Sequence, residues 1–165
     1  MNIFVLDSHP VTAAQMQCDK HVVKMCTESA QMLASALHRY GIDEALLPLT
    51  KVGTPYKSTH PHHPCTRWAG DTSTNFDWLC MHGLALCDEY YFRYQKIHAC
   101  QKLIDEMRRA NLAHEVLPIG DQTPFSQAVP DVFKCDNAVK AYRSYYKTKH
   151  FAKWKMGRSA PAWWE

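Results

Sequence analysis

Apolar residues recur at helical intervals through most of this chain of 165 residues, and that periodicity is the feature that most restricts its fold. Between residues 10 and 39 they form one stripe along a single long helix, with a break expected near residues 18–19. Ser8 is the expected N-cap, Pro10 belongs to the first turn, and Gly41 supplies the stop. The stripe consists of Val22, Met25, Cys26, Met32, Leu33, Ala36, Leu37 and Tyr40.

The same periodicity predicts three further helices, at about residues 65 or 71 to 94, 98 to 111 and 137 to 149. Their expected buried positions are Phe76, Leu79, Leu84, Leu86, Cys87 and Tyr91 in the first, and Leu103, Ile104 and Met107 in the second. Proline-rich connections at 41–64 and 120–136 separate them, and residues 3–6 form the one segment with strand character. We therefore expect a mainly helical fold: a compact single-domain bundle over residues 1–165, with about four main helices and long loops.

Composition places the protein among globular, water-soluble chains. Apolar residues make up 46% and charged residues 21%, and a chain of this length buries roughly 68–70% of its unfolded surface. No apolar run approaches the ~20 residues of a membrane span, and the first residues lack the features of a signal peptide. We expect a cytoplasmic protein with no membrane association, located in the host cytoplasm if a phage encodes it.

The cysteines are expected to be free thiols. There are seven of them, an odd number, and no pair has CxxC spacing. In a reducing compartment most of them should act as small buried hydrophobic residues.

A line of polar residues on the first long helix is one candidate site. Lys20, Lys24 and Glu28 lie at i, i+4 and i+8, and His21 is adjacent to them. Steps of four place these groups along one face. Two cations beside a carboxylate suit phosphate binding and proton transfer. The alternative is a solvated face with weak ion pairs.

A second candidate is the histidine-rich segment at residues 59–68 (THPHHPCTRW). Its prolines hold the backbone extended, so alternate side chains point apart, and the spacings of a zinc site are absent. We expect no metal and no cofactor here. The segment is better interpreted as a rigid loop that positions His63, Arg67 and Trp68.

The C-terminal part is basic and aromatic, with a distinct tail from about residue 150. From residue 140 onward it carries seven basic residues and one acid, Glu165. Arg143 and Lys147 are candidate phosphate contacts, since cations follow a nucleic-acid backbone and aromatic rings stack on exposed bases. A basic amphipathic helix that buries its aromatic residues would give the same pattern.

Two segments resemble the phage-type pyrimidine-dimer DNA glycosylases. Residues 20–33 are similar to that family's K-[RH]-x-x-K-x-x-x-E run, and residues 63–68 are similar to its H-P-x-x-x-W segment. The resemblance covers roughly residues 18–70. It implies a compact helical fold that acts on damaged or unusual pyrimidines, with DNA or a pyrimidine nucleotide as the partner.

The resemblance also implies roles for individual residues. Glu28 would be the catalytic acid, with Lys20, His21 and Lys24 on phosphates. Arg67 and Trp68 would grip an extruded base. In the family the N-terminal amine, here that of Met1, attacks the sugar C1′.

The sequence departs from the family at its start. Asn2 is bulky, so Met1 should be retained, whereas the best-known member of the family exposes a small residue. That departure weakens the expectation of strand-cleaving chemistry. It leaves three functions open: a DNA glycosylase, an enzyme on a pyrimidine nucleotide or hypermodified base, and a non-catalytic nucleic-acid-binding module.

Overall fold

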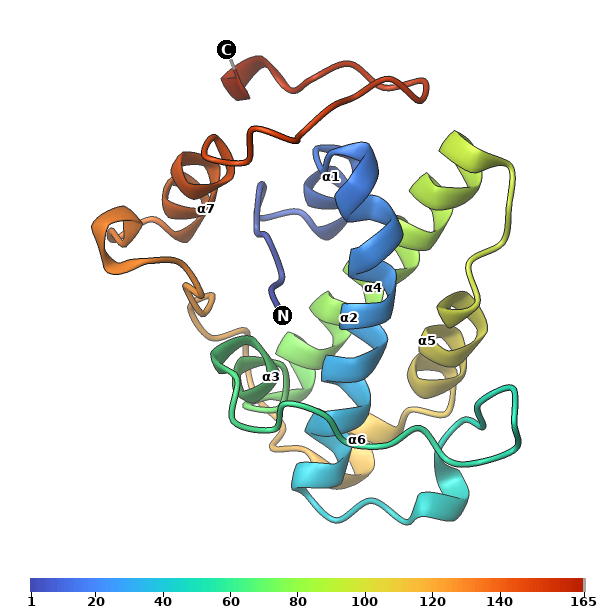
Figure 1. The fold of residues 1–165 in the computed structure, drawn as a ribbon. Helices are drawn as coiled ribbons and strands as arrows, with labels where there is room; N and C mark the ends of the chain where they lie inside the picture. Colours follow the sequence, from blue (N-terminus) through green and yellow to red (C-terminus); the bar gives the residue numbers. More distant parts are fainter. Residues whose placement is uncertain (165) are drawn as a thin grey trace.

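Two long helices form the centre of the computed structural model, which describes residues 1–164. Helix α2 (Asp19–Arg39) and helix α4 (Ser73–Tyr94) pack against each other and run in opposite directions (Figure 1). The other helices are α1 (Pro10–Gln15), α3 (Pro64–Ala69), α5 (Cys100–Arg109), α6 (Leu112–Val116) and α7 (Ala138–Tyr146), with the short 3-10 helices η1 (Glu44–Leu46), η2 (Asp131–Phe133) and η3 (Ala162–Trp164).

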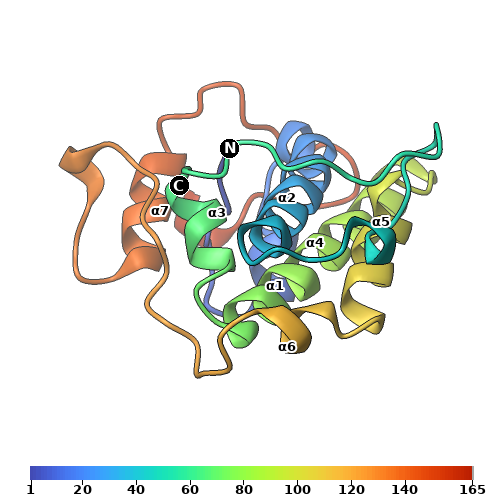
Figure 2. The same ribbon diagram turned by 90° about the horizontal axis from the view of Figure 1, so that it is seen from below.

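The remaining helices flank this central pair. Seen from below, α5 lies on one side of α2 and α4 while α7 lies on the other, with the N-terminal segment between α7 and α2 (Figure 2). The C-terminal segment crosses above α1. Glu165 lies outside the described residues. Among residues 1–164, no helix is both long enough and apolar enough to cross a bilayer.

The predicted all-α class is confirmed, since residues 1–164 contain seven α-helices and no strand. The possible strand at residues 3–6 is wrong. These residues are buried, but the backbone turns at Phe4, whose φ is +38°. The N–H of Phe4 donates to the Asn2 side chain at 2.9 Å, and no neighbouring strand pairs with the segment.

Most helix boundaries agree with the periodicity, and the differences have local causes. The first long helix breaks at Cys18 as expected, but His9, not Ser8, precedes α1. The second predicted helix is divided into α3 and α4. Thr72 is the N-cap of α4, and its side chain accepts from the Asn75 N–H. Tyr91 is 52% exposed, contrary to its expected burial. Helix α6 was not predicted; it follows a left-handed turn at Asn111.

The predicted state of the cysteines is confirmed. All seven are free thiols, and all except Cys135 are buried. The expected stripe on α2 is likewise in the core, with Tyr40 half-buried at its end.

The C-terminal segment is fixed by aromatic and ionic contacts. The indole N–H of Trp154 donates to the Met16 carbonyl at 3.1 Å, and Trp163 packs edge-on against Tyr146. Arg158 bonds through its guanidinium to Glu89 on α4. The aromatic residues of the tail therefore pack largely into the protein, as the amphipathic alternative described.

One buried histidine makes the stability of the fold depend on pH. His82 on α4 donates from Nδ1 to the Pro10 carbonyl at 2.9 Å and accepts from Gln17 at Nε2. Burial lowers its pKa from 6.5 to about 4. An unfolded chain binds this proton near pH 6.5 and the folded chain does not, so stability falls as the pH falls from about 6.5 to 4.

We therefore predict that His82→Gln flattens the pH dependence of the free energy of unfolding. Each such histidine contributes a slope of up to about 1.4 kcal/mol per pH unit between its two pKa values. Urea unfolding across that range measures the slope. An unchanged slope in a folded His82→Gln protein would contradict the assignment.

Candidate active site

Glu28 is a buried carboxylate surrounded by nitrogen donors. It lies on α2, 8% exposed, facing the N-terminal segment. Its Oε2 accepts from the backbone N–H of Asn2 at 2.9 Å and lies 3.8 Å from the amino group of Met1. Its Oε1 pairs with the Lys24 ammonium at 3.0 Å. The carboxylate is thus held in one orientation by groups from two segments.

A hollow of about 290 Å³ opens over this carboxylate. Three parts of the chain form it: the N-terminal segment, the first half of α2, and the residues at the end of α7. Its lining consists of Met1, Asn2, Phe4, His21, Lys24, Met25, Glu28, Tyr145, Lys149 and Phe151. The hollow therefore combines a carboxylate, an amine, lysines and aromatic rings.

Asn2 anchors the N-terminal segment beside α2. Its side-chain N–H donates to the Ala128 carbonyl at 2.8 Å, and its side-chain oxygen accepts from Phe4. The Met1 thioether accepts from the Thr66 hydroxyl of α3 at 3.4 Å. These contacts explain why the Asn2 backbone N–H and the Met1 amine face Glu28.

His21 is a neutral donor at the edge of the hollow. The Tyr146 hydroxyl accepts from the Cys18 N–H at 3.0 Å and hydrogen-bonds His21 Nδ1 at 2.6 Å. When the hydroxyl is the donor in that bond, the His21 proton lies on Nε2, where it can be donated to a ligand. Burial and nearby lysines lower the His21 pKa to about 4, so the ring is uncharged at neutral pH. The phosphate contact that the resemblance implies for His21 would therefore be made by an uncharged ring.

Lysines and an exposed aromatic ring surround the mouth of the hollow. Lys24 has a side chain that is 66% exposed despite its pairing with Glu28. The ammonium of Lys149 lies 3.7 Å from the centre of the Tyr145 ring, and that of Lys20 lies 4.8 Å from the centre of the Phe151 ring. This arrangement offers cations for phosphates and a ring face for a base.

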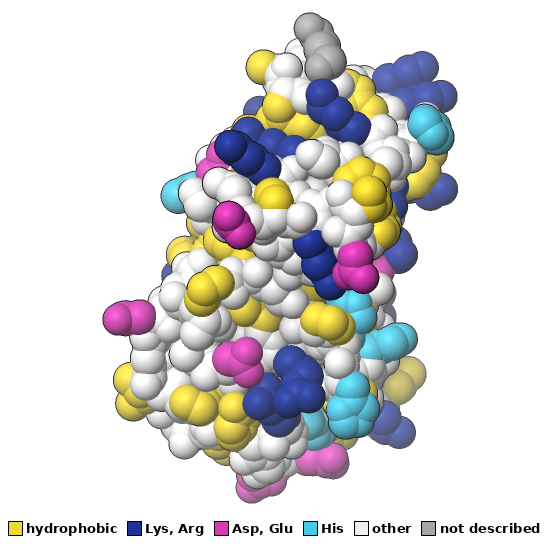
Figure 3. Space-filling model, turned by 90° about the vertical axis from the view of Figure 1, so that its left-hand side faces the viewer, with side chains coloured by type: hydrophobic (Ala, Val, Ile, Leu, Met, Phe, Trp, Pro, Cys, Tyr) yellow, Lys and Arg dark blue, Asp and Glu magenta, His cyan; other side chains and the backbone are white. Residues whose placement is uncertain are grey.

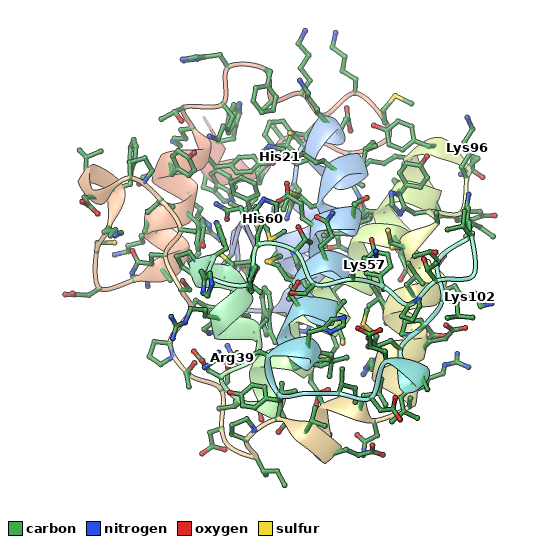
Figure 4. The ribbon with its side chains drawn as sticks, turned by 60° about the horizontal axis from the view of Figure 1, so that its bottom comes forward. His21, Arg39, Lys57, His60, Lys96 and Lys102 are labelled. Carbon is green, nitrogen blue, oxygen red and sulfur yellow. The ribbon has the colours of Figure 1, made fainter. Side chains whose placement is uncertain are left out.

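The histidine-rich loop lies near the site but does not line it. His63 caps α3 by accepting from the Cys65 N–H at 3.2 Å. Burial lowers its pKa, and the Met1 amino group lowers it further, so His63 is electrostatically coupled to the site. In Figure 4 the label of His60, from this loop, stands just below that of His21, from α2.

Other predicted residues lie away from the hollow. Trp68 is 3% exposed and packs against Trp78 and Phe125, which is a core position, so it cannot grip a base in this structure. Arg67 is exposed on α3 and is not part of the lining. Arg143 donates to the Leu6 carbonyl at 2.8 Å, a structural contact, and Lys147 is exposed outside the lining.

Similarity to known proteins agrees with this geometry. A model of the pyrimidine dimer DNA glycosylase family matches residues 1–102, well over half of the chain. The chain belongs to the pyrimidine dimer DNA glycosylase family. The matched part contains α2 with Glu28 and the segment that begins at Met1. Searches of curated proteins and of solved structures found no match.

The glycosylase family match ends before the opposite wall of the hollow. Tyr145, Lys149 and Phe151 all lie beyond residue 102. They were not among the predicted site residues, although Lys149 and Phe151 belong to the basic-aromatic pattern. Figure 3 shows Lys and Arg side chains gathered at the end of the molecule where the C-terminal segment lies, and histidines along one edge below.

Proposed function

We propose that the protein is a DNA N-glycosylase that removes a damaged or modified pyrimidine, with Glu28 as its catalytic carboxylate. The observation that carries the proposal is the contact of Glu28 with the Met1 amine and Lys24 within one hollow. Membership of the glycosylase family supports DNA as the substrate.

The chemistry needs a carboxylate held away from bulk water. Breaking the bond between C1′ and the base nitrogen builds positive charge on the sugar, which a buried carboxylate stabilises. Glu28 is restrained by the Asn2 N–H, so it needs little reorganisation during the reaction. His21 Nε2–H supplies a neutral donor for the departing base or for a sugar oxygen.

The Met1 amine is the nucleophile that the geometry favours. It lines the hollow, and Glu28 Oε2 at 3.8 Å is placed to take a proton from it. Attack at C1′ forms an N–C bond while the base leaves with its electron pair, and ring opening then gives an imine that permits strand cleavage. A water in the same place would give base removal alone, so the two routes have different products.

The hollow suits one extruded nucleotide. Its volume of about 290 Å³ is at the lower end of the ~300–1,000 Å³ typical of ligand sites. Reaching the bond in duplex DNA requires flipping the nucleotide out, at a cost of a few kcal/mol. Stacking on Phe151 and phosphate contacts from Lys20, Lys24 and Lys149 would offset that cost.

The test uses a duplex with one ultraviolet-induced pyrimidine dimer and the matched undamaged duplex. We expect cleavage of a glycosidic bond in the damaged duplex alone, detected as an alkali-labile abasic sugar because the cut base stays joined to its dimer partner, and a covalent protein–DNA adduct after borohydride reduction that reductive methylation of the amine prevents. Abasic-site formation without an adduct would exclude the Met1 amine. No abasic site in any damaged or modified pyrimidine duplex, with turnover of free pyrimidine nucleotides, would overturn the proposal in favour of a nucleotide enzyme.

The lysines at the mouth of the hollow give a separate prediction about DNA affinity. Lys149→Ala should weaken binding and reduce the slope of log K against log salt concentration by about 1, because one phosphate contact is lost. Fluorescence anisotropy at several salt concentrations measures this slope. Lys96→Ala, distant from His21 in Figure 4, is the control and should leave it unchanged. Equal slopes for the parent, Lys149→Ala and Lys96→Ala would contradict a phosphate contact by Lys149.

A further inference from the structure

Two buried thiols and an imidazole lie close together in a cluster that does not line the hollow over Glu28. Cys26 lies on α2, Cys87 lies on α4, and His98 lies two residues before α5. Their ligand atoms, two Sγ and one imidazole nitrogen, all lie within 4.8 Å of one another. Both cysteines are buried and His98 is half-buried. Three elements of the fold thus direct metal-ligand side chains to one point.

We propose that the Cys26–Cys87–His98 cluster binds a zinc-class metal ion. Thiolates with imidazole are the donor set that Zn²⁺ prefers among protein ligands. A tetrahedral site with Zn–S bonds of about 2.3 Å places its ligand atoms roughly 3.5–4 Å apart. Ligand atoms already within 4.8 Å reach that geometry by small side-chain movements. Binding would release the two thiol protons.

Both ring nitrogens of His98 are engaged in hydrogen bonds, so a metal ion would bind by displacing one partner. Its Nδ1 accepts from the Cys100 N–H at 3.1 Å, so the proton of the neutral ring lies on Nε2. The ring also interacts with the Val23 carbonyl, the kind of partner that orients a metal-bound histidine. A metal at Nδ1 would replace the Cys100 amide and keep the tautomer.

Cys100 lies beside the cluster, and its Sγ, which is not among the three ligand atoms within 4.8 Å of one another, would have to move to supply a fourth ligand. It follows His98 by two residues, and its Sγ lies 3.8 Å from the hydroxyl of Thr27, the neighbour of Cys26. Surface hollows adjoin both residues, one bordered by His98 and another by Cys100. Figure 4 shows Lys96 and Lys102, which bracket this segment, at the outer side of the molecule. A metal ion therefore has a short route to the cluster.

The consequence of binding would be mechanical rather than catalytic. The ion would join α2, α4 and the start of α5, and Cys26 precedes Glu28 on α2 by less than one turn. This cluster differs from the histidine-rich segment at residues 59–68, where no metal was expected. Its members are far apart in sequence, so no spacing pattern revealed it.

The test is a titration of the metal-free, reduced full-length chain with Co²⁺, followed by absorption. We expect saturation at one Co²⁺ per chain, with tetrahedral d–d bands and a sulfur-to-metal charge-transfer band that Zn²⁺ displaces. Cys87→Ala should lose the charge-transfer band or weaken Co²⁺ affinity at least 100-fold. Cys80→Ala, at another buried cysteine of α4, should bind as the parent does.

A second measurement, the Tm with and without Zn²⁺, tests the proposal even if Cys87→Ala does not fold. Zn²⁺ at about 100 times its Kd should raise the Tm of the parent by about 5–10 °C, and His98→Gln, at a half-buried position, should lose that increase. The proposal is overturned if the reduced parent shows no thiolate charge-transfer band, or if Cys87→Ala and His98→Gln bind Co²⁺ as tightly as the parent. A Cys26–Cys87 disulfide that persists under reducing conditions would also overturn it.

Discussion

Glu28→Gln is expected to lower the rate of glycosidic-bond cleavage by about 10²–10⁴-fold, the range for loss of a positioned acid–base group. Glutamine keeps the size of the side chain and can still accept from the Asn2 N–H. It cannot take a proton from the Met1 amine or neutralise positive charge on the sugar. Single-turnover kinetics with the dimer-containing duplex measures the effect on the chemical step.

Affinity distinguishes a catalytic role for Glu28 from a structural one. DNA binding by Glu28→Gln should stay within about threefold of the parent, or become tighter because a negative charge has been removed near phosphates. Glu115→Gln, at an exposed position on α6, is the matched control and should be fully active. A Glu28→Gln protein that cleaves the glycosidic bond at the parental rate would remove Glu28 from the mechanism.

Glu89→Ala should lower the free energy of unfolding by about 3–5 kcal/mol, the usual cost of leaving a buried charge unpaired. Glu89 accepts from Arg93 at 3.0 and 3.1 Å, and Arg158 of the tail bonds to the same carboxylate. The Arg93 side chain is fully buried, so water cannot replace the lost partner. Asp19, whose Oδ1 lies 3.0 Å from Arg93 Nη1, would neutralise only part of the Arg93 charge.

Equilibrium urea unfolding measures this loss. Glu106→Ala breaks the exposed pair with Lys102 on α5 and should change stability by at most about 0.5 kcal/mol. A loss below about 1 kcal/mol for Glu89→Ala would show that Asp19 alone satisfies Arg93. The comparison separates a buried ion network from a surface pair of the same i,i+4 spacing.

The helices were predictable because each buries a stripe that is visible in the chain. The stripe from Val22 to Leu37 is entirely in the core, and the break at Cys18 lies where it was expected. The strand predicted at residues 3–6 is absent because an apolar run can also be a buried, unpaired connection, here bent at Phe4. Tyr91 fits the periodicity but occurs in the last turn of α4, where Arg93 is the buried residue and Tyr91 is 52% exposed.

The site was predictable only where its residues share one helix. Glu28, Lys24 and His21 follow from spacing on α2, and the structure places all three in the hollow. Trp68 shows the limit, because a tryptophan that stacks on a base and one that fills a core look alike in sequence. Lys149 and Phe151 reach the hollow through the packing of α7 against the N-terminal segment, a tertiary contact that carries no local signal.

The position of the first residues inside the hollow has a practical consequence for anyone who produces this protein. Asn2 is pinned between Glu28 and the Ala128 carbonyl, so any peptide attached ahead of Met1 would begin inside the cavity, between Lys24 and Lys149. Such an extension would plug the opening and modify the amine at once. An affinity handle joined to the other end of the chain, which lies far from the N label in Figure 1, would begin at a segment that is not part of the lining, and comparing the two fusions would show how far access to that cavity governs the enzyme.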